Sequence, residues 1–389
     1  MKNIILSIII PTKNRTENLI EILNVLSSYN WNKSEIEIII HDNSMQNTDI
    51  NNYLKSNSIS SIVKYFYTTL SLSQSENSNL ATMKAQGEFL CFIGDDDCVH
   101  KEIINVVKWM KINKYDILIN TKPEYVWSNI VPTKFSKFTS GMLFTYRYTA
   151  LYTIKNCDTQ LRLHLENGGQ YISDLPQFYH GIVKKSILDK IFAETGTYFP
   201  GPSPDMAIAT ALTCFSKFYI LLDFPLIISG KSVNSVGGLG LKGKHIGKIS
   251  DISFLPSDTS DNWTQFIPFY WSGSTIYAES VFKSLTKINR LDILFNFNFN
   301  YLYAKCLVFD YKYINFILNN IYLNPESTYL KVIYFYFIIW LNRLKTFFTN
   351  RTFLINYTNK KFHYNLNNYF EVFKILDIET KGLILPWKS

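Results

Sequence analysis

The chain of 389 residues contains the stretch FLCFIGDDD from Phe89 to Asp97, an apolar run followed directly by three carboxylates. The apolar part is typical of a strand covered on both faces, as in a parallel sheet. Three neighbouring carboxylates cannot be core residues, because burying an unpaired charge costs too much free energy. They also repel one another, which raises their proton affinity unless a cation neutralises them. We therefore expect Asp95, Asp96 and Asp97 at the end of a buried strand.

A hard divalent cation, Mg²⁺ or Mn²⁺, would remove this repulsion and would bridge the carboxylates to the oxygens of a diphosphate. The alternative interpretation is an acidic turn that caps a following helix at Lys101–Met110. We favour the metal site, because ligands of open parallel sheets bind at the carboxyl ends of the strands.

Strand and helix patterns alternate around this stretch. The segments expected as strands are Ile4–Ile10, Glu35–Ile40, Val63–Tyr67 and Phe89–Ile93, and those expected as helices are Thr16–Tyr29, Asn77–Gln86, Lys101–Met110 and Asp205–Phe218. This alternation predicts an α/β fold with an open, mostly parallel sheet and flanking helices. Asp42 follows the second strand, where a nucleotide is often bound; an Asx turn with Ser44 is the alternative.

Composition narrows the class of protein. A hydrophobic share of 47% and an aromatic share of 16% exclude intrinsic disorder. The formal charge of +8 suits an anionic ligand or an anionic membrane surface. We expect no nucleic acid partner, because the sequence has neither a zinc-ligand spacing nor a long arginine tract.

The cysteines and the apolar runs indicate the cellular location. Five cysteines are scattered without a CxxC pair, which favours free thiols in a reducing compartment. The apolar run after Lys2 ends at Pro11 without a small-residue cleavage site, so we expect no signal peptide. No run reaches the roughly 18 to 20 apolar residues that span a bilayer. The prediction is a cytoplasmic protein.

Three segments resemble family 2 glycosyltransferases with the GT-A fold. Leu6–Arg15 is similar to their opening strand and loop, His41–Ser44 to their second-strand aspartate, and Asn79–Asp97 to the helix and DXD-type motif that follow. The resemblance is specific over residues 4–100 and patchier to residue 250. It implies a GT-A-type, mostly parallel nucleotide-binding sheet and a metal-dependent, inverting transfer from a nucleotide-diphosphate sugar, with a UDP-sugar favoured.

The resemblance also implies roles for the acidic residues. Asp42 would meet the nucleotide base, Asp95 would face the ribose, Asp96 would bind Mn²⁺ or Mg²⁺ directly, and Asp97 would support the metal shell. The other residues expected to bind the nucleotide sugar are Pro11, Thr12, Asn14, Arg15 and Asn79. The family often has arginine where this chain has Ser78, so one diphosphate or base contact differs.

A second site follows Gly201. The segment leading to Pro204 and Asp205 resembles the part of these enzymes that supplies the catalytic base. An inverting transfer needs a carboxylate that takes the acceptor proton. We favour this role for Asp205 over a helix N-cap, with Asp174 and Glu166 in reserve.

The segment Ser229–Lys248 is rich in Gly and Lys and is expected to be a loop that closes over a diphosphate. His245 is the only nearby histidine; it is either a further metal ligand, as in the family, or a solvated side chain. The Gln-x-x-Arg-Trp signature of processive family members is absent, which favours single sugar additions.

The expected organisation is a catalytic domain at 1–250, with a nucleotide-sugar half at 1–122 and an acceptor half at 123–250. A mostly helical region follows at 251–389. The apolar helix Tyr329–Leu341 could lie in a membrane interface, but packing in the core or between subunits is favoured, because its apolar residues surround the helix. Rings bordering the acceptor cleft are expected at Tyr125, Trp127, Tyr171, Phe178 and Tyr179.

We expect the acceptor to be a surface glycan or a lipid-linked glycan. If the protein contacts the membrane peripherally, it would do so at the inner face of the cell membrane. One alternative function is a GT-A-like sugar nucleotidyltransferase, but Pro11–Arg15 lacks the Gly-rich loop of that class. The other is a non-catalytic module that binds glycans or membranes, which the acidic strand ends disfavour.

Overall fold

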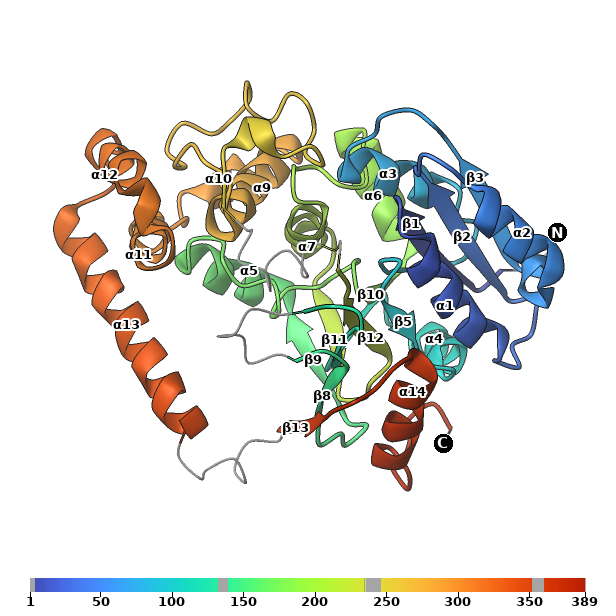
Figure 1. Ribbon diagram of the computed structural model, residues 1–389. Coiled ribbons are helices and arrows are strands. Elements are labelled where there is room, and N and C mark those ends of the chain that lie inside the picture. Colours follow the sequence, from blue (N-terminus) through green and yellow to red (C-terminus); the bar gives the residue numbers. More distant parts are fainter. Residues whose placement is uncertain (1–3, 132–138, 234, 236–245, 352–359, 389) are drawn as a thin grey trace.

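The computed structural model describes residues 4–131, 139–233, 235, 246–351 and 360–388 (Figure 1). Among these residues, the larger sheet has the strand order β3-β2-β1-β4-β10-β6-β11-β9. Its strands are β1 Leu6–Thr12, β2 Ile36–Asp42, β3 Val63–Tyr67, β4 Phe89–Phe92, β6 Ile117–Asn120, β9 Tyr152–Asn156, β10 Gly181–Lys184 and β11 Phe218–Leu222. Strands β3, β2, β1 and β4 are parallel, as are β6 and β11, whereas β10 and β9 are antiparallel to their neighbours. The mostly parallel α/β sheet predicted from the sequence is confirmed.

Both faces of this sheet are covered, which explains the continuous apolar run of β1. Leu6, Ile8 and Ile10 belong to one core, and Ile9 belongs to the core on the opposite face. Side chains alternate between the two faces of a strand, so most positions of a strand covered on both faces are apolar. Ser7 of β1 is a buried exception, and it donates a hydrogen bond of 2.6 Å to Glu37 of β2.

Helices flank the sheets and build the rest of the molecule (Figure 1). They are α1 Thr16–Ser27, α2 Thr48–Ser56, α3 Gln74–Met83, α4 Ile103–Ile112, α5 Cys157–Glu166, α6 Lys185–Thr195, α7 Pro204–Phe215, α9 Gly273–Lys287, α10 Leu291–Leu294, α11 Phe299–Phe309, α12 Ile314–Leu323, α13 Tyr329–Arg351 and α14 Tyr369–Glu379. A core made by residues of α5, α7, α9, α11, α12 and α13 confirms the mostly helical C-terminal region. In the described part of the chain, no helix is long and apolar enough to cross a membrane.

A smaller sheet has the order β13-β8-β7-β12-β5. Its strands are β5 Cys98–Val99, β7 Glu124–Val126, β8 Met142–Tyr146, β12 Ile227–Lys231 and β13 Lys360–His363. β5 was not among the expected strands, β12 includes the start of the segment predicted as a loop, and β13 lies in the region predicted to be mostly helical. β13 pairs with β8, and the Phe362 and Phe144 side chains contact each other across the pair.

The last helix, α14, returns to the beginning of the chain. Figure 1 shows α14 near α4 and β5, on the side of the molecule opposite to α13. Tyr369, Val372 and Leu376 of α14 are buried in the same core as β1 and α1. Residues at the end of the described chain therefore belong to the same core as β4, the strand that precedes the three carboxylates.

Candidate active site

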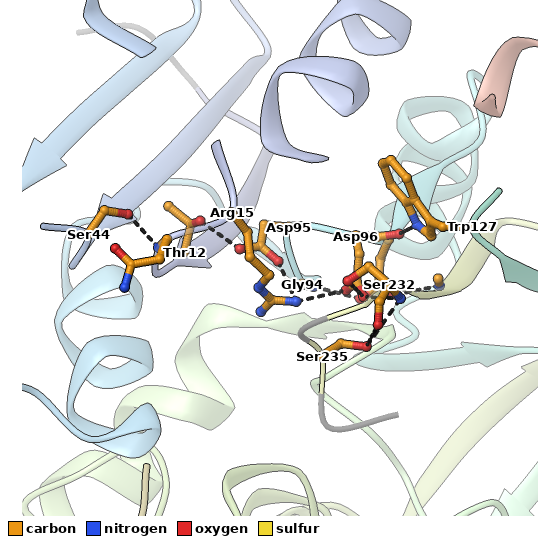
Figure 2. Close-up of polar contacts among 12 residues, drawn as sticks. Thr12, Arg15, Ser44, Gly94, Asp95, Asp96, Trp127, Ser232 and Ser235 are labelled. Atoms are coloured by element: carbon orange, nitrogen blue, oxygen red, sulfur yellow. Dashed lines mark hydrogen bonds and ion pairs between the residues drawn. The ribbon is translucent and has the colours of Figure 1, made fainter. Parts of the chain in front are cut away.

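Asp95, the first carboxylate after β4, is completely buried. Its Oδ2 accepts a hydrogen bond of 2.6 Å from Thr12 Oγ1 at the end of β1, and its Oδ1 lies 2.9 Å from Arg15 Nη1 (Figure 2). Because β1 and β4 are neighbouring parallel strands, their carboxyl ends meet at one edge of the sheet. The sequence prediction that Thr12, Arg15 and Asp95 share a site is consistent with these contacts.

Asp96 lies beside the same guanidinium but is held from another direction. Its Oδ2 accepts hydrogen bonds from Ser232 N at 3.0 Å and Ser232 Oγ at 2.8 Å, just after β12. Its Oδ1 lies 3.6 Å from Arg15 Nη1. Two further donors bind its backbone carbonyl: Trp127 Nε1 at 3.0 Å and the Tyr369 hydroxyl of α14 at 2.7 Å.

Asp97 is held by four donors from three segments. Its oxygens accept hydrogen bonds from Gly94 N at 2.7 Å, Tyr179 Oη at 2.9 Å, His180 Nε2 at 2.7 Å and Gly230 N at 2.8 Å. Every partner is a donor, so this carboxylate joins β4 to the segment before β10 and to β12. We call residues 94–97, which follow β4, the acidic loop, and we interpret Asp97 as the residue that shapes it.

Gly230 of β12 is required for this close approach. A Cβ atom at that position would lie 1.7 Å from the Asp96 carbonyl oxygen. Because that oxygen belongs to the backbone, the clash could not be avoided by rotating a side chain. The strand therefore passes directly against the acidic loop only because residue 230 has no side chain.

The three carboxylates differ in their electrostatics. Burial raises the pKa of Asp95 to about 7, although the Arg15 charge opposes the shift. Burial and the neighbouring Asp97 charge raise the pKa of Asp96. Burial also disfavours ionisation of Asp97, but its pKa is lowered, because His180 and the donors Gly230 N and Gly94 N stabilise the charged form.

A divalent cation fits the first two carboxylates. Asp95 Oδ1 and Asp96 Oδ1 both face one positive charge, the Arg15 guanidinium, and carboxylate oxygens are the ligands that Mg²⁺ and Mn²⁺ prefer. Asp97 fits less well, since four donors already bind it. Across the described ranges, no three His, Cys, Asp or Glu side chains form a metal-binding group, and His245 lies outside those ranges.

Asp42 is the last residue of β2, which pairs with β1 on the side opposite to β4. Its Oδ1 accepts a hydrogen bond from Ser44 N at 2.8 Å, the Asx turn considered from the sequence, and its Oδ2 accepts one from Tyr65 Oη at 2.8 Å. Ser44 Oγ in turn accepts a hydrogen bond from Asn14 N at 2.6 Å (Figure 2). Asn14 has a φ of 56°, so the backbone turns sharply between β1 and α1. Pro11 lies beside His41 in the sheet.

Asn79 lies on α3 and is directed to another segment. Its Oδ1 accepts hydrogen bonds from Tyr198 N at 2.9 Å and Thr197 Oγ1 at 3.2 Å. The α3 residue that contacts the strand ends is Asn77, whose Nδ2 donates to Thr12 O at 3.2 Å and whose Oδ1 lies 2.6 Å from His41 Nδ1. The sequence analysis named Asn79 from the family resemblance and missed Asn77, whose contact with the end of β1 depends on how α3 packs on the sheet.

Asp205 occupies the first turn of α7. Its Oδ1 accepts hydrogen bonds from Ser203 Oγ and, at 2.8 Å, from Met206 N, which is a local helix-start arrangement. Its Oδ2 lies 3.4 Å from the Tyr277 hydroxyl of α9. The Asp205 charge, together with burial, raises the pKa of Tyr277.

Lys122 is a half-buried cation that the sequence analysis did not name. Its Nζ donates a hydrogen bond of 2.7 Å to Gln177 Oε1. Burial lowers the pKa of Lys122, while the charges of Asp97, Glu124 and Asp205 oppose the shift.

The predicted acceptor-cleft rings and reserve bases differ in their exposure. Tyr125 and Phe178 are completely buried and Trp127 nearly so, because they pack in the cores; the prediction that they stack on an acceptor is wrong. Tyr171 is exposed, and Tyr179 donates to Asp97. The side chains of the reserve bases, Asp174 and Glu166, are exposed to solvent.

Residues 7–163 match the family model described as glycosyl transferase family 2. Over these residues, the chain is similar to that family. The resemblance inferred from the strand ends is therefore confirmed for the part that contains β1, β2, β4 and the acidic loop.

A curated relative is the poly(ribitol-phosphate) beta-N-acetylglucosaminyltransferase TarS of Staphylococcus aureus, which is 26% identical over 159 residues. The match covers 38% of this chain and 26% of TarS, so the chain spans about a quarter of the length of the relative. Among solved structures, S. aureus TarS 1–349 in complex with UDP-GlcNAc is similar with a TM-score of 0.49 and 14% identity, covering 82% of this chain and 81% of that one. The mannosyltransferase PcManGT from Pyrobaculum calidifontis, in complex with GDP-Man and Mn²⁺, gives a TM-score of 0.38 and 13% identity, covering 78% and 75%.

Proposed function

We propose that this protein is a metal-dependent, inverting glycosyltransferase that moves single sugars from a nucleotide-diphosphate sugar to a hydroxyl acceptor. The observation that carries the proposal is the grouping of carboxylates at the carboxyl ends of two strands that flank β1. Asp95 and Asp96 follow β4 and Asp42 ends β2, and Thr12 of β1 pairs with Asp42 in the sheet and donates a hydrogen bond to Asp95. The family match over residues 7–163 supports the same reaction class.

Each residue has a chemical task in this proposal. Asp42 contacts the base, Asp95 and Thr12 contact the ribose, and Asp205 takes the proton of the acceptor hydroxyl as its oxygen bonds to the anomeric carbon. The bond between that carbon and the diphosphate breaks in the same step, and the nucleoside diphosphate leaves. Arg15 supplies a fixed positive charge beside Asp95 and Asp96.

A bound Mn²⁺ or Mg²⁺ would be held by Asp96, assisted by Asp95, and would neutralise the negative charge of the leaving diphosphate. The local geometry supports this assignment, because the two Oδ1 atoms share one cationic partner.

The donor that we propose to test first is a UDP-sugar, because the relative TarS is named an N-acetylglucosaminyltransferase. We propose a surface glycan or lipid-linked glycan as acceptor, since the name of that relative describes a poly(ribitol phosphate) acceptor. The five free cysteines support a location in a reducing compartment, the cytoplasm.

The first experiment measures UDP binding by calorimetry with and without Mn²⁺, and then sugar transfer from a panel of nucleotide sugars. We expect metal-dependent UDP binding. Asp96→Asn should weaken this binding, because it removes the carboxylate assigned to the metal. If no nucleoside diphosphate binds in the presence of the metal, the proposed activity is wrong and a non-catalytic module is favoured.

The second experiment separates the base from the donor site. Asp205→Asn should abolish transfer, reducing kcat by at least about 100-fold as expected for loss of a general base, while UDP binding stays unchanged. The matched control is Asp292→Asn, at an exposed aspartate of α10 paired with Arg290. Full transfer activity in Asp205→Asn would remove the base assignment.

A further inference from the structure

Helix α13 presents apolar side chains on two opposite faces. On the inner face, Val332 and Ile339 are buried in the helical core, with Phe335 and Tyr336 packed partly against it. Figure 1 shows α13 beside α11 at the edge of the molecule, with no described element on its outer side. The apolar residues that surround the helix in the sequence therefore divide into an inner set buried in the helical core and an outer set that stays largely exposed. Within the outer set, the Trp340 ring also contacts the Arg343 guanidinium, 4.7 Å away.

The outer face carries a continuous stripe of exposed apolar residues, which we call the outer stripe. Its members are Leu330 (82% exposed), Ile333 (50%), Tyr334 (61%), Phe337 (61%), Trp340 (37%), Leu341 (63%) and Leu344 (46%). At 3.6 residues per turn they fall within an arc of about 120°. Scattered exposed apolar residues are ordinary, but a contiguous stripe on a monomer marks an interaction surface.

The charges on α13 indicate which partner covers the stripe. The exposed part of the helix between residues 329 and 346 contains Lys331, Arg343 and Lys345 and no acidic residue. Lys331 and Lys345 border the stripe at helical spacing. Two copies of such a helix would bring like charges together, whereas an anionic surface would complement them.

The residue types of the stripe point to the same partner. Tyr and Trp combine an apolar ring with a polar group, and therefore favour the boundary between lipid headgroups and acyl chains. An interfacial helix lies in the membrane plane with its apolar face inserted and its basic residues at the headgroups. No helix among the described residues could cross the membrane, so an in-plane orientation is the one that the helix allows.

We propose that the outer stripe of α13 docks on the surface of an anionic lipid bilayer, with the aromatic side chains at headgroup level. This inference concerns a surface far from the acidic loop and does not depend on the proposed glycosyltransferase activity.

The test is flotation of the full chain with vesicles of phosphatidylcholine alone or with about 30% phosphatidylglycerol, at low and high salt. We expect binding to the anionic vesicles to be at least about tenfold tighter than to neutral ones and to weaken at high salt. Leu330→Ser with Phe337→Ser should reduce it at least about tenfold, because both apolar anchors are lost. Lys331→Glu with Lys345→Glu should abolish the preference for anionic lipid.

The matched control is Leu151→Ser with Ile384→Ser, which replaces two apolar residues that are 69% and 87% exposed elsewhere. It should bind vesicles like the unchanged chain. All variants replace exposed side chains, so the thermal unfolding midpoint should stay within a few degrees. Equal vesicle binding by the stripe variant would overturn the proposal. So would a dimer, detected by light scattering, that the stripe variant converts to a monomer, because the occupant would then be a second copy.

Discussion

His164 shows how strongly a single buried group can couple folding to pH. This histidine of α5 is buried; its Nδ1 lies 3.1 Å from Tyr171 O, and its Nε2 has no hydrogen-bond partner in the described structure. Burial lowers its pKa to about 4, and the nearby Lys305 charge acts in the same direction. By contrast, the buried carboxylate of Asp97 has four donors and stays ionised.

We predict that His164 destabilises the protein in acid. Between about pH 6.5 and pH 4 the unfolded chain binds a proton at this position and the folded chain does not, so the free energy of unfolding falls as pH falls. The expected loss attributable to His164 is about 3 kcal/mol at pH 4 relative to pH 7. The measurement is urea unfolding at a series of pH values. The free energy of unfolding of His164→Gln should fall less steeply below pH 6.5 than that of the unchanged protein. Equal slopes in both proteins would contradict this assignment.

At the scale of elements, α14 contributes a donor to the acidic loop although 273 residues separate Tyr369 from Asp96. The contact arises because α14 packs against α1 and shares a core with β1 and β4. Tyr125 makes a comparable hydrogen bond of 3.2 Å, but to Leu366 O instead of the acidic loop.

We predict that Tyr369 positions Asp96 for its ligand. Tyr369→Phe removes one hydrogen bond to the Asp96 carbonyl, worth about 1 kcal/mol net, and should raise the donor KM or the Kd for UDP with Mn²⁺ about fivefold. The control Tyr125→Phe removes a hydroxyl that holds the same C-terminal segment, and should leave KM unchanged. If both variants lower stability alike and neither changes KM or Kd, Tyr369 is only a packing residue.

The elements that could be predicted from the sequence are those with a local pattern. β1, β2 and β4 are apolar because both faces are covered, and α1 has its buried residues at helical spacing. The parallel arrangement of the strands predicted that Asp42, after β2, and the carboxylates after β4 lie at the same edge of the sheet. Ser232, Gly230 and Tyr369 could not be predicted, because their contacts with the acidic loop depend on pairings between distant segments.

Across the whole molecule, the C-terminal part of the chain contributes to two different cores. Residues of α14 lie in the core of β1, whereas α9, α11 and α13 build the helical core. The domain limits of 1–250 and 251–389 remain a prediction. Although α14 belongs to the predicted region 251–389, its buried residues lie in the core of the N-terminal part.

We predict that α14 stabilises the N-terminal core. Phe373 is 8% exposed and contacts the rings of Tyr29 and His100, so Phe373→Ala should cost about 3 to 5 kcal/mol of unfolding free energy. Phe370, three residues earlier in α14, is 43% exposed and serves as the control, with an expected cost below about 1 kcal/mol. Equal midpoints for the two variants in urea unfolding would show that α14 does not support this core.

The position of Tyr369 has a consequence for the order of events during synthesis. The carboxylates at 95–97 leave the ribosome long before residue 369 is translated, and domains generally begin to fold from the N-terminus. A nascent chain would hold its acidic loop without the hydroxyl that binds the Asp96 carbonyl until the last helix arrives. Ligand binding would thus mature only when α14 has been released and packed, which separates the making of the sheet from the completion of its site.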